Sequence, residues 1–532
     1  YTGLSVPLIL APHEESIVYF TLSEMPFVLE DGEEALARAK RKAGRLPKIT
    51  LGGEYGELSK WLVQQVWNSR FAGRTGFYQV SGAYGFRDQL QDCLALLYAD
   101  PASVRAHLLE CAQHQFKAGD VQHWWHPPAV GVRTHVCDDR LWLVYVACVY
   151  ALQTGDDAVF SERVPFLNDV PIQPTEATVY AAANVAAEKE SLYEHCLRAL
   201  AVVFDRGVHG LILLRGGDWL DALDVAGKEG KGESVWCTMF AVRVLTLFLR
   251  HVKDEKEREL LGRARDELQC AAQNAFYNDR FLRAVTDDGT VLGAPSAKAC
   301  KIDLLAQSFA TLCDIGTREQ QQAALTTAYN MLVDEEKGII SLFDPPFTSP
   351  DGIGYLGKYP PYVRENGGQY TQAAVWYVFA LFKAGETEKA NKLLSYLSPI
   401  AKCATKEGVA AYGGEPYVTA SDVYGGAFNG YAGWTWYTGS ASWLYKLLIE
   451  QYAGITVRGS TLIFDPHLPQ STPSLTVTVL YENERIEIEI VNSKNSGDWR
   501  VRIGGVVYNT PQLRLHKGLA GKRIAVVRLP NK

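Results

Sequence analysis

The chain has 532 residues, of which 47% are hydrophobic, and its formal net charge is −7. This length exceeds one ordinary domain, so we expect two or three domains, one of them large. The small charge and the lack of a basic stripe argue against a nucleic-acid partner. The longest apolar stretch, residues 142–152, is far shorter than the ~20 residues that a membrane-spanning helix needs. We therefore expect no membrane partner either.

Cysteine usage points to a reducing compartment. The ten cysteines form no CxxC pair, and most stand beside alanine, leucine or valine in segments with helical spacing. Small buried thiols are the plain explanation, and they predict a cytoplasmic protein. No cysteine–histidine cluster has the spacing of metal ligands, so the sequence predicts no metal site.

Within residues 1–27, Ser16–Leu22 has a sequence pattern typical of a β-strand, and no partner strand precedes it. We expect residues 1–27 to be the end of an N-terminal β-sandwich domain, the rest of which precedes this chain. Residues 28–54 are expected to form a linker region. It contains an exposed helix over residues 32–44, which are rich in Glu, Ala, Arg and Lys.

Residues 55–452 are mostly helical in pattern, and no fixed sequence repeat is visible among them. So many amphipathic helices must bury their faces against one another, and an α/α double-helix barrel fits better than a simple solenoid. The predicted helices are 56–70, 86–98, 102–117, 138–153, 176–206, 234–251, 256–277, 299–313, 317–333, 368–384, 386–397 and 435–451.

Residues 453–532 change to a period-two alternation of apolar and polar side chains. The clearest segments are 475–481, 485–491, 501–503 and 523–528. This alternation is typical of half-buried strands, so we predict a small C-terminal antiparallel β sandwich. The fold class is therefore mainly α, with β domains at the two ends.

The most informative local feature is Gly216-Gly217-Asp218-Trp219-Leu220-Asp221. An aromatic ring can stack on a sugar face, and a carboxylic acid can protonate a glycosidic oxygen. The two glycines allow a sharp turn and a close approach to a ligand. Asp-Trp pairs also occur in ordinary loops, so this motif needs support from the rest of the chain.

Three further loops give that support. One joins Trp124 to Arg133 and the Asp138-Asp139 pair, a second spans residues 359–370, and a third spans residues 433–440. The loops also have structural alternatives. Asp138 and Asp139, for example, can cap the helix that follows them. We expect one of these aspartates to cap the helix and the other to bind ligand. The start of the last helix is also a suitable anion site.

Five motifs in this order resemble the glycoside hydrolase family 94 phosphorylases. They are GFRDQLQD (residues 85–92), GDVQHWWHP (119–127), DWLD (218–221), RENGG (364–368) and WYTGS (436–440). The resemblance implies an N-terminal β sandwich, linker helices, an (α/α)6 barrel and a C-terminal β domain. It also implies reversible, inverting phosphorolysis of a β-glucosidic bond, which releases α-glucose 1-phosphate. Members often form homodimers.

The resemblance also implies roles for individual residues. Asp221 would be the general acid, and phosphate would be the co-substrate, with no cofactor. The sugar-binding residues would be Arg133, Asp139, Trp219 and Glu365 in the donor subsite, Tyr359 and Arg364 on the acceptor side, and Trp124 as further lining. Phosphate would be bound by Thr438 and Gly439 together with Gln372.

The chemistry agrees with a single essential carboxylate. Phosphate is already an anionic nucleophile, so it needs positioning and charge compensation rather than a base. The acid must be protonated at working pH, and apolar surroundings such as Trp219 would raise the pKa of Asp221. Asp218 is expected to be a positioning or structural carboxylate.

Two positions depart from the family pattern. Leu220 stands where asparagine is usual, and Gln372 stands where a phosphate-binding histidine is usual; glutamine can donate a hydrogen bond but carries no charge. A hydrolase or transglycosylase with Glu365 or Asp422 as base therefore stays open, as does a catalytically weak carbohydrate-binding module. Residues 230–236 resemble the chitobiose and β-1,2-glucan branches, which favours β-1,2-oligoglucans as substrate.

Overall fold

The computed structural model describes residues 6–16, 18, 34, 49–69, 82–168, 170–173, 176–436, 438–493 and 497–529. It has two compact units, Tyr1–Leu46 and Pro47–Lys532. In the first unit, residues 6–16 form neither helix nor strand. The predicted strand over 16–22 and the predicted helix over 32–44 lie almost wholly outside the described residues, so both stay predictions.

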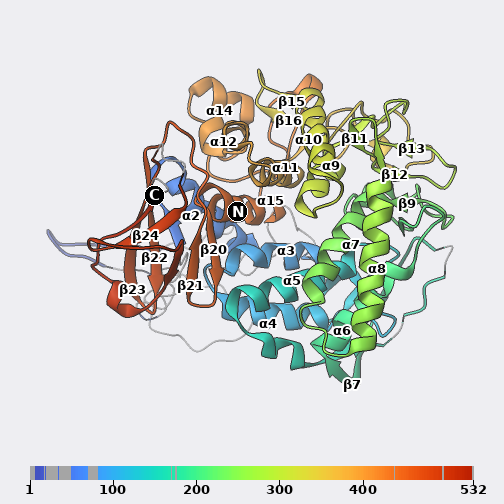
Figure 1. Ribbon diagram of the computed structural model, residues 1–532, viewed down its shortest axis with the longest axis horizontal. Coiled ribbons are helices and arrows are strands. Elements are labelled where there is room, and N and C mark those ends of the chain that lie inside the picture. The colour runs from blue at the N-terminus through green and yellow to red at the C-terminus, as the bar shows by residue number, and fades with distance from the viewer. Residues whose placement is uncertain are drawn as a thin grey trace. The chain divides into compact units, whose positions relative to one another are not determined.

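The second unit is built on a closed ring of six helices. Each helix packs on the next in chain order, and the last packs back on the first (Figure 1). Nearly all side chains of the third, fourth and fifth members are buried, which explains why their sequences are apolar on every side. The ring consists of α3 (Phe86–Leu96), α5 (Asp139–Thr154), α7 (Val235–Phe248), α9 (Leu304–Leu312), α11 (Thr371–Lys383) and α15 (Thr438–Leu447).

Six amphipathic helices pack outside this ring, each against one or two of its members. On α8, for example, Leu261 and Leu268 are buried whereas Leu260 is exposed. Side-chain caps fix several of their starts, including a capping box between Thr317 and Gln320 ahead of α10. These outer helices are α2 (Gly56–Trp67), α4 (Pro101–Ala112), α6 (Leu192–Ala199), α8 (Glu255–Asn274), α10 (Arg318–Leu332) and α12 (Thr387–Tyr396).

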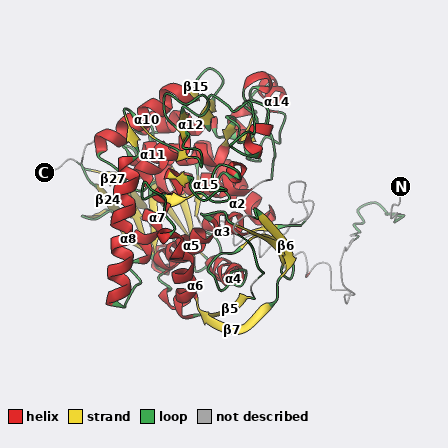
Figure 2. Ribbon diagram, turned by 90° about the vertical axis from the view of Figure 1, so that its right-hand side faces the viewer, coloured by secondary structure: helices red, strands yellow, loops and turns green. Residues whose placement is uncertain are grey.

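One predicted helix is wrong over half its length. Residues 176–206 were predicted as a single helix, but β6 (Thr178–Ala182) and β7 (Val185–Ser191) occupy their first part, and only α6 and a short 3-10 turn follow. The alanines of this stretch favour a helix locally. Pairing overrides that preference, because β6 joins β4 and β7 joins β5 (Arg163–Leu167) at the outer edge of the helices (Figure 2).

Short strands stand directly before four of the ring helices. They pair with strands from other loops, so the segments that enter the N-terminal ends of the ring helices are tied together. The four are β2 (Tyr84–Gly85), β9 (Glu233–Ser234), β14 (Ile302–Asp303) and β18 (Gln369–Tyr370). Their partners include β3 (Gln122–His126), which leads on to β4 (Val130–Thr134), and β8 (Ile212–Leu213), β12 (Ala284–Val285), β17 (Phe343–Asp344) and β19 (Asp422–Val423).

The C-terminal region forms two sheets, seen in red and orange in Figure 1. Leu475, Val477 and Val479 are buried on one face of β22, as the period-two pattern predicts. The predicted all-antiparallel arrangement is wrong at one place, because β23 and β27 pair in parallel. The six-stranded sheet has the order β1 (Ile49–Leu51), β22 (Ser474–Tyr481), β23 (Glu484–Val491), β27 (Ile524–Arg528), β24 (Trp499–Ile503) and β25 (Val506–Tyr508); the other joins β20 (Ile455–Arg458), β21 (Thr461–Phe464) and β26 (Gln512–Arg514).

Strand β1 comes from the segment that we predicted to be linker, and it pairs with β22 along residues 49–51. The sheet is thus completed by residues from both sides of the helical region. All ten cysteines are unpaired thiols, and eight of them are buried. Within the described parts of the chain, no helix has the length and apolar character needed to cross a bilayer.

The packing of α8 gives a matched test of the outer helical layer. Leu261→Ala leaves a cavity beneath α8 and should lower the free energy of unfolding by about 2–5 kcal/mol. Leu260→Ala, one residue earlier and 48% exposed, should change it by no more than about 0.5 kcal/mol. Urea unfolding of both variants measures this, and equal losses would contradict the assigned inward face of α8.

Candidate active site

The residues that carry chemistry gather where the ring helices begin. Arg87 is the second residue of α3, Asp139 the first of α5, Gln372 the second of α11 and Gly439 the second of α15. Asp221 lies in the loop that precedes β9 and α7. Loops that meet at one end of a rigid helical scaffold are the usual place for a binding site.

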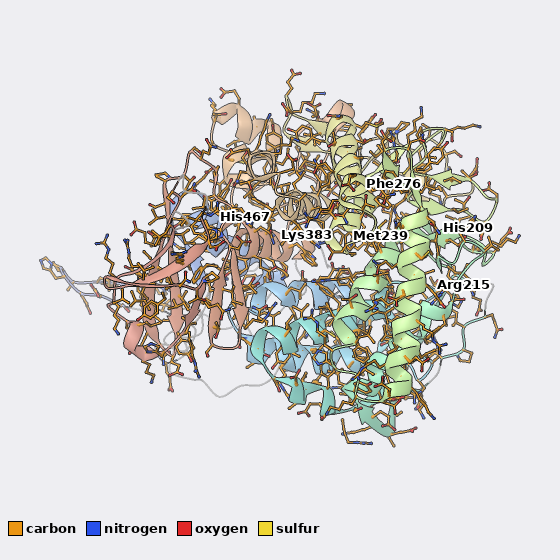
Figure 3. All side chains as sticks on the ribbon, viewed as in Figure 1. His209, Arg215, Met239, Phe276, Lys383 and His467 are labelled. Atoms are coloured by element: carbon orange, nitrogen blue, oxygen red, sulfur yellow. The ribbon has the colours of Figure 1, made fainter. Side chains whose placement is uncertain are left out.

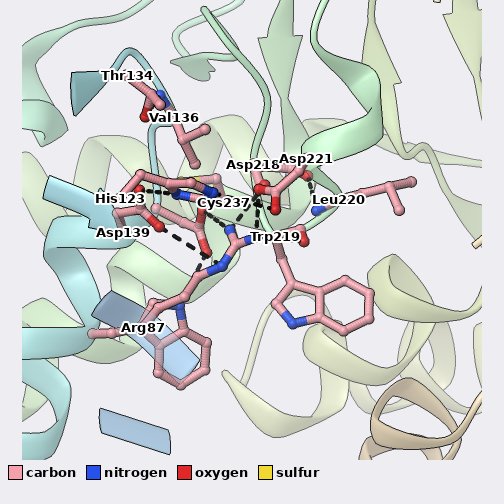
Figure 4. A network of polar contacts seen from close by, with 12 residues as sticks. Arg87, His123, Thr134, Val136, Asp139, Asp218, Trp219, Leu220, Asp221 and Cys237 are labelled. Carbon is pink, nitrogen blue, oxygen red and sulfur yellow. Dashed lines mark hydrogen bonds and ion pairs between the residues drawn. The ribbon is translucent and has the colours of Figure 1, made fainter. Parts of the chain in front are cut away.

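Asp221 is the best-placed carboxylate in this group (Figure 4). Its side chain is 35% exposed, and Oδ1 accepts a hydrogen bond from Arg87 Nη2 at 2.5 Å. The second oxygen, Oδ2, lies 3.5 Å from His123 Nε2. Asp221 can therefore face a ligand on one side while two cationic groups hold it from behind.

The charge state of Asp221 corrects one expectation. Burial raises the pKa of this carboxyl, but the charges of Arg87 and His123 and the hydrogen bonds from both outweigh burial and lower it to about 2. We had expected the surroundings of Trp219 to raise this pKa. The sequence motif shows the tryptophan beside Asp221, but it does not show the two cations that folding brings there.

Arg87 joins the Asp218–Asp221 turn to the ring. Its Nη1 donates to Asp138 Oδ1 at 2.7 Å and to the carbonyl of Asp218 at 3.0 Å, while Nη2 also donates to the carbonyl of Trp219 at 3.0 Å. The guanidinium is almost fully buried. It thus fixes both the backbone and the carboxylate of the Asp218–Asp221 turn. No role for Arg87 was predicted from the sequence. A cation in the first turn of a helix, where the dipole disfavours positive charge, was nevertheless a signal that Arg87 binds carboxylates.

His123 is a second residue that the sequence analysis left without a role. Its Nδ1 contacts Asp139 Oδ2 at 2.8 Å, so the ring bridges Asp139 and Asp221. Burial lowers the pKa of His123, but the two carboxylates reverse this effect and raise it well above its ordinary value. The other oxygen of Asp139, Oδ1, is buried, accepts no hydrogen bond and lies 3.7 Å from Arg87 Nε.

The Asp138-Asp139 pair behaves differently from our expectation. Asp138 occupies the N-cap position of α5, but its side chain makes no capping hydrogen bond. It instead accepts hydrogen bonds from Arg87 and from Trp142 Nε1, the latter at 2.9 Å. The prediction that one aspartate would cap the helix through its side chain is therefore wrong, because Arg87 competes for that carboxylate.

Asp218 matches the structural role expected for it. Its two oxygens accept a bidentate pair of hydrogen bonds from Arg283, both 2.7 Å long, and Ser234 donates a further one of 2.6 Å. Burial raises the pKa of Asp218, but the charge and hydrogen bonds of Arg283 outweigh it and hold the pKa below its ordinary value. Arg283 also lies 3.4 Å from Asp303, the N-cap of α9.

A small polar cavity of about 120 Å³ opens beside Asp221. Arg364 pairs with Glu365 at 3.1 Å, and its guanidinium lies over the rings of Tyr359 and Trp434, at 5.3 and 4.1 Å from their centroids. Six predicted site residues line this cavity together: Trp219, Asp221, Tyr359, Arg364, Glu365 and Gln372. Arg87, Asp88, Tyr355 and Tyr370 complete it.

Gln372, which lines the cavity, is in close contact with Gly439. A Cβ on Gly439 would lie 2.4 Å from Gln372 Oε1, so a larger residue there would force the Gln372 side chain to move. Gln372 in turn donates to Gln91 Oε1 at 2.5 Å. Nearby in sequence, the buried hydroxyls of Thr371 and Ser440 have no hydrogen-bond partner in the described structure. The side chain of Thr438 lies outside the described residues.

Three predicted sugar-binding residues are not among those that line this cavity: Arg133, Trp124 and Asp139. Arg133 forms a buried bidentate pair with Asp120 at 2.6 and 2.7 Å, and it also donates to the carbonyl of Val170. Trp124, on β3, packs against His126 and Tyr180. Asp139 contacts His123, which in turn lies beside Asp221. The sugar-binding roles of all three stay predictions.

The two carboxylates considered as alternative bases are also located. Glu365 is held by Arg364 within the cavity lining. Asp422 is fully buried, and burial raises its pKa; Oδ1 accepts from Ser421, whereas Oδ2 has no hydrogen-bond partner. Over the described residues, no group of three or more His, Cys, Asp or Glu side chains could hold a metal ion.

Comparison with known proteins gives one family. The model of the glycosyl hydrolase 94 superfamily, catalytic domain, matches residues 57–454. The cyclic beta-(1,2)-glucan synthase NdvB of Rhizobium meliloti (strain 1021) is 40% identical over 458 residues, which are 85% of this chain and 16% of that protein. The solabiose phosphorylase of Paenibacillus borealis is 28% identical over 84% of this chain and 55% of its own length.

Two weaker similarities complete the comparison. The 1,2-beta-oligoglucan phosphorylase of Listeria innocua is 22% identical over 87% of this chain and 44% of its own length. Among solved structures, a GH78 family rhamnosidase of Bacillus sp. GL1 shares the fold, with a TM-score of 0.53, 11% identity and coverage of 84% of this chain and 42% of that one. The chain thus spans about half the length of the phosphorylases it matches, and less of the synthase.

The ion pair of Asp218 gives a test of the site's framework. Asp218→Asn leaves Arg283 buried with only Asp303 as a nearby charge, and it should lower the free energy of unfolding by about 3–5 kcal/mol. The matched control is Asp205→Asn, because Asp205 holds Arg215 in a similar bidentate pair that is about 40% exposed. Loss of that surface pair should cost no more than about 1 kcal/mol in urea unfolding. Equal effects would show that Asp218 does not anchor the loop.

Proposed function

The chain belongs to the glycosyl hydrolase 94 superfamily, and from this membership we propose that it catalyses reversible, inverting phosphorolysis of a β-linked gluco-oligosaccharide. The products would be α-glucose 1-phosphate and an acceptor shortened by one unit. The observation that carries this proposal is the position of Asp221, a partly exposed carboxylate beside Trp219 in a polar cavity.

The ring of helices belongs to the same proposal. Six helices closed in a ring, with six others packed outside, are the arrangement expected of an (α/α)6 barrel. The two C-terminal sheets support the β sandwich that we infer to follow it. Similarity to a (1,2)-glucan synthase and to a 1,2-oligoglucan phosphorylase supports β-1,2-glucan oligosaccharides as the substrate class.

In the phosphorolytic direction, Asp221 would first have to take up a proton against the charges of Arg87 and His123, which lower its pKa. It would give that proton to the glycosidic oxygen while the bond from that oxygen to the anomeric carbon breaks. A phosphate oxygen would bond to the same carbon from the opposite face, which inverts its configuration. Asp221 would end as a carboxylate. In synthesis it would start as one and take the proton of the acceptor hydroxyl, so one residue serves both directions.

The other site residues would position the substrates. Trp219 would offer a ring face to the donor sugar. Asp139, which contacts His123, stays a predicted donor-subsite residue. Tyr359 and Arg364 would line the acceptor side, with Glu365 on the donor sugar. Trp219 and the residues of the 359–365 loop approach the cavity from two separate loops, which is how a preorganised site is built.

Phosphate would bind at the first turns of α11 and α15. The unpartnered hydroxyls of Thr371 and Ser440, the Gln372 amide and the backbone at Thr438 and Gly439 supply donors there. Helix N-termini favour an anion even where the usual histidine is replaced by glutamine. Phosphate would be the co-substrate and no cofactor is proposed; a homodimer and a cytoplasmic location stay predictions.

An inorganic-phosphate release assay tests the reaction. We expect the purified protein to release phosphate from α-glucose 1-phosphate in the presence of sophorose more readily than with glucose, cellobiose or N-acetylglucosamine. Asp221→Asn should lower kcat about 10²–10⁴-fold, because it removes the proton transfer. Asp205→Asn, remote from the cavity, is the control and should retain activity.

The second candidate is a hydrolase or transglycosylase on the same fold, which is favoured by Gln372 and by the buried Asp422, whose Oδ2 has no hydrogen-bond partner. It predicts turnover of a β-glucoside without phosphate. Phosphate-independent turnover that is abolished by Asp422→Asn or Glu365→Gln, with no phosphate release from glucose 1-phosphate, would replace the phosphorylase proposal with this one.

The pH profile of synthesis tests the electrostatics of Asp221. Its pKa of about 2 keeps the carboxylate form that synthesis needs, so kcat/KM should show no acid limb from Asp221 down to about pH 4. His123→Gln keeps a hydrogen-bonding side chain but removes a positive charge, so the pKa of Asp221 rises. The variant should therefore lose kcat/KM at a higher pH than the wild type with the same substrates. Superimposable profiles would show that His123 does not hold Asp221 ionised.

A further inference from the structure

A second and larger cavity, of about 500 Å³, lies toward the other end of the ring. Its walls come from the later turns of the ring helices, such as Gln153 near the end of α5, Leu247 of α7, Leu312 of α9 and Lys383 of α11. Residues of β20 and the segment after β21, including His467, close it. Figure 3 labels Lys383 and His467 where the ring meets the C-terminal strands. This size is ordinary for a small-molecule site.

The deep wall of this cavity is aromatic. Trp142, Trp376, Trp443 and Phe240 all line it, and the centroids of Trp376 and Trp443 are 5.5 Å apart. Trp376 also packs against Trp219, with ring centroids 5.3 Å apart, so a layer of tryptophans separates this cavity from the catalytic one. Broad aromatic faces suit the apolar faces of a sugar ring.

Two buried donors in the wall have no partner. Trp376 Nε1 and Gln153 Nε2 make no hydrogen bond in the described structure, although the residues are only 1% and 5% exposed. A buried donor without an acceptor costs about 1–3 kcal/mol. Both atoms lie beneath the surface of the cavity, so the wall is polar in composition behind its aromatic faces.

The polar part of the lining has more cations than carboxylates. Lys446 and Lys383 are already paired, with Glu450 and with Asp314 respectively. Among the described residues, however, no hydrogen bond or ion pair holds the guanidinium of Arg243, and no carboxylate pairs with Arg458. The carboxylates in the lining are Glu450 and Asp465.

Arg243 and Arg458 act on each other as like charges. Burial lowers the pKa of Arg458 first, Glu450 opposes that effect, and repulsion from Arg250 and Arg243 lowers it further. An anion between these arginines would relieve both the repulsion and the lack of partners. Guanidinium groups bind phosphate oxygens through paired, charge-assisted hydrogen bonds.

We propose that this second cavity, called the axial cavity below, is a ligand site that takes a hexose phosphate. The phosphate group would lie between Arg243 and Arg458, and the sugar ring would lie against the tryptophan faces. The site is separate from the catalytic cavity, and it does not require the phosphorylase reaction proposed above.

Calorimetric titration of the full protein with α-glucose 1-phosphate tests the proposal. We expect two binding events, one of which is weakened at least about tenfold by Arg243→Gln and by Arg458→Gln. The matched control is Arg263→Gln, because Arg263 is an exposed arginine of α8 that does not line the cavity, and both events should persist in it. Thermal midpoints of all variants exclude unfolding as the cause.

The outcomes separate this inference from the proposed function. Arg364→Gln should weaken the other event, since Arg364 lines the catalytic cavity. A single event that only Arg364→Gln weakens would overturn the second site and leave the phosphorylase proposal intact. If the protein shows no phosphorylase activity but keeps the binding event that depends on Arg243, the phosphorylase proposal is overturned and the second site stands.

Three probes test the ligand class. Glucose should bind the axial cavity at least tenfold more weakly than glucose 1-phosphate, because it has no anion for the arginines. Inorganic phosphate should also bind more weakly, because it has no ring for the tryptophans. Binding of adenosine monophosphate tighter than that of glucose 1-phosphate would overturn the hexose assignment, as would equal binding of glucose or of inorganic phosphate.

Discussion

The buried guanidinium of Arg87 is the interaction on which the cavity end of the helical ring depends. A cation in the first turn of a helix opposes the helix dipole, and burial removes the water that would otherwise stabilise it. Arg87 is stabilised by Asp138 and Asp221 and by two carbonyls of the Asp218–Asp221 turn. The same contacts fix that turn, so the position of the Asp221 carboxylate follows from the need to satisfy a buried charge.

A second buried cation, Arg283, fixes the other carboxylate of the Asp218–Asp221 turn. Arg283 binds Asp218 with both arms of its guanidinium and approaches Asp303 at the start of α9. Burial raises the pKa of Asp303 to about 6, whereas Arg283 lowers that of Asp218. The catalytic turn is thus held between two arginines, one on each carboxylate. This explains how two acids three residues apart acquire different roles, with Asp218 enclosed and Asp221 open to the cavity.

The two ends of the ring differ in chemistry. At the helix starts, polar groups and ion pairs surround a small cavity; toward the helix ends, tryptophans and unpaired arginines surround a larger one. Trp219 and Trp376 meet between them. The polar end favours developing negative charge near the helix N-termini, which is where an anionic nucleophile would act.

The sequence by itself determined the local elements and the residue types of the site. Helical spacing located nearly all the ring and outer helices, and period-two alternation located the C-terminal strands, because both patterns reflect burial of one face. The motifs around Asp221, Glu365 and Gln372 placed six lining residues in one cavity. Residues 176–191 were wrongly predicted as helix. Their alanines favour a helix locally, whereas the strands with which they pair lie elsewhere in the chain.

Only the tertiary structure decided the electrostatics. Arg87 lies 134 positions before Asp221, and His123 lies 98 positions before it, so no local motif could show that they meet the same carboxylate. The pKa of an acid depends on burial and on charges within a few ångströms, whatever their separation along the chain. For the same reason the sequence could not show that Arg133 would pair with Asp120, that Asp138 would bind Arg87 instead of capping α5, or that strand β1 would complete the C-terminal sheet.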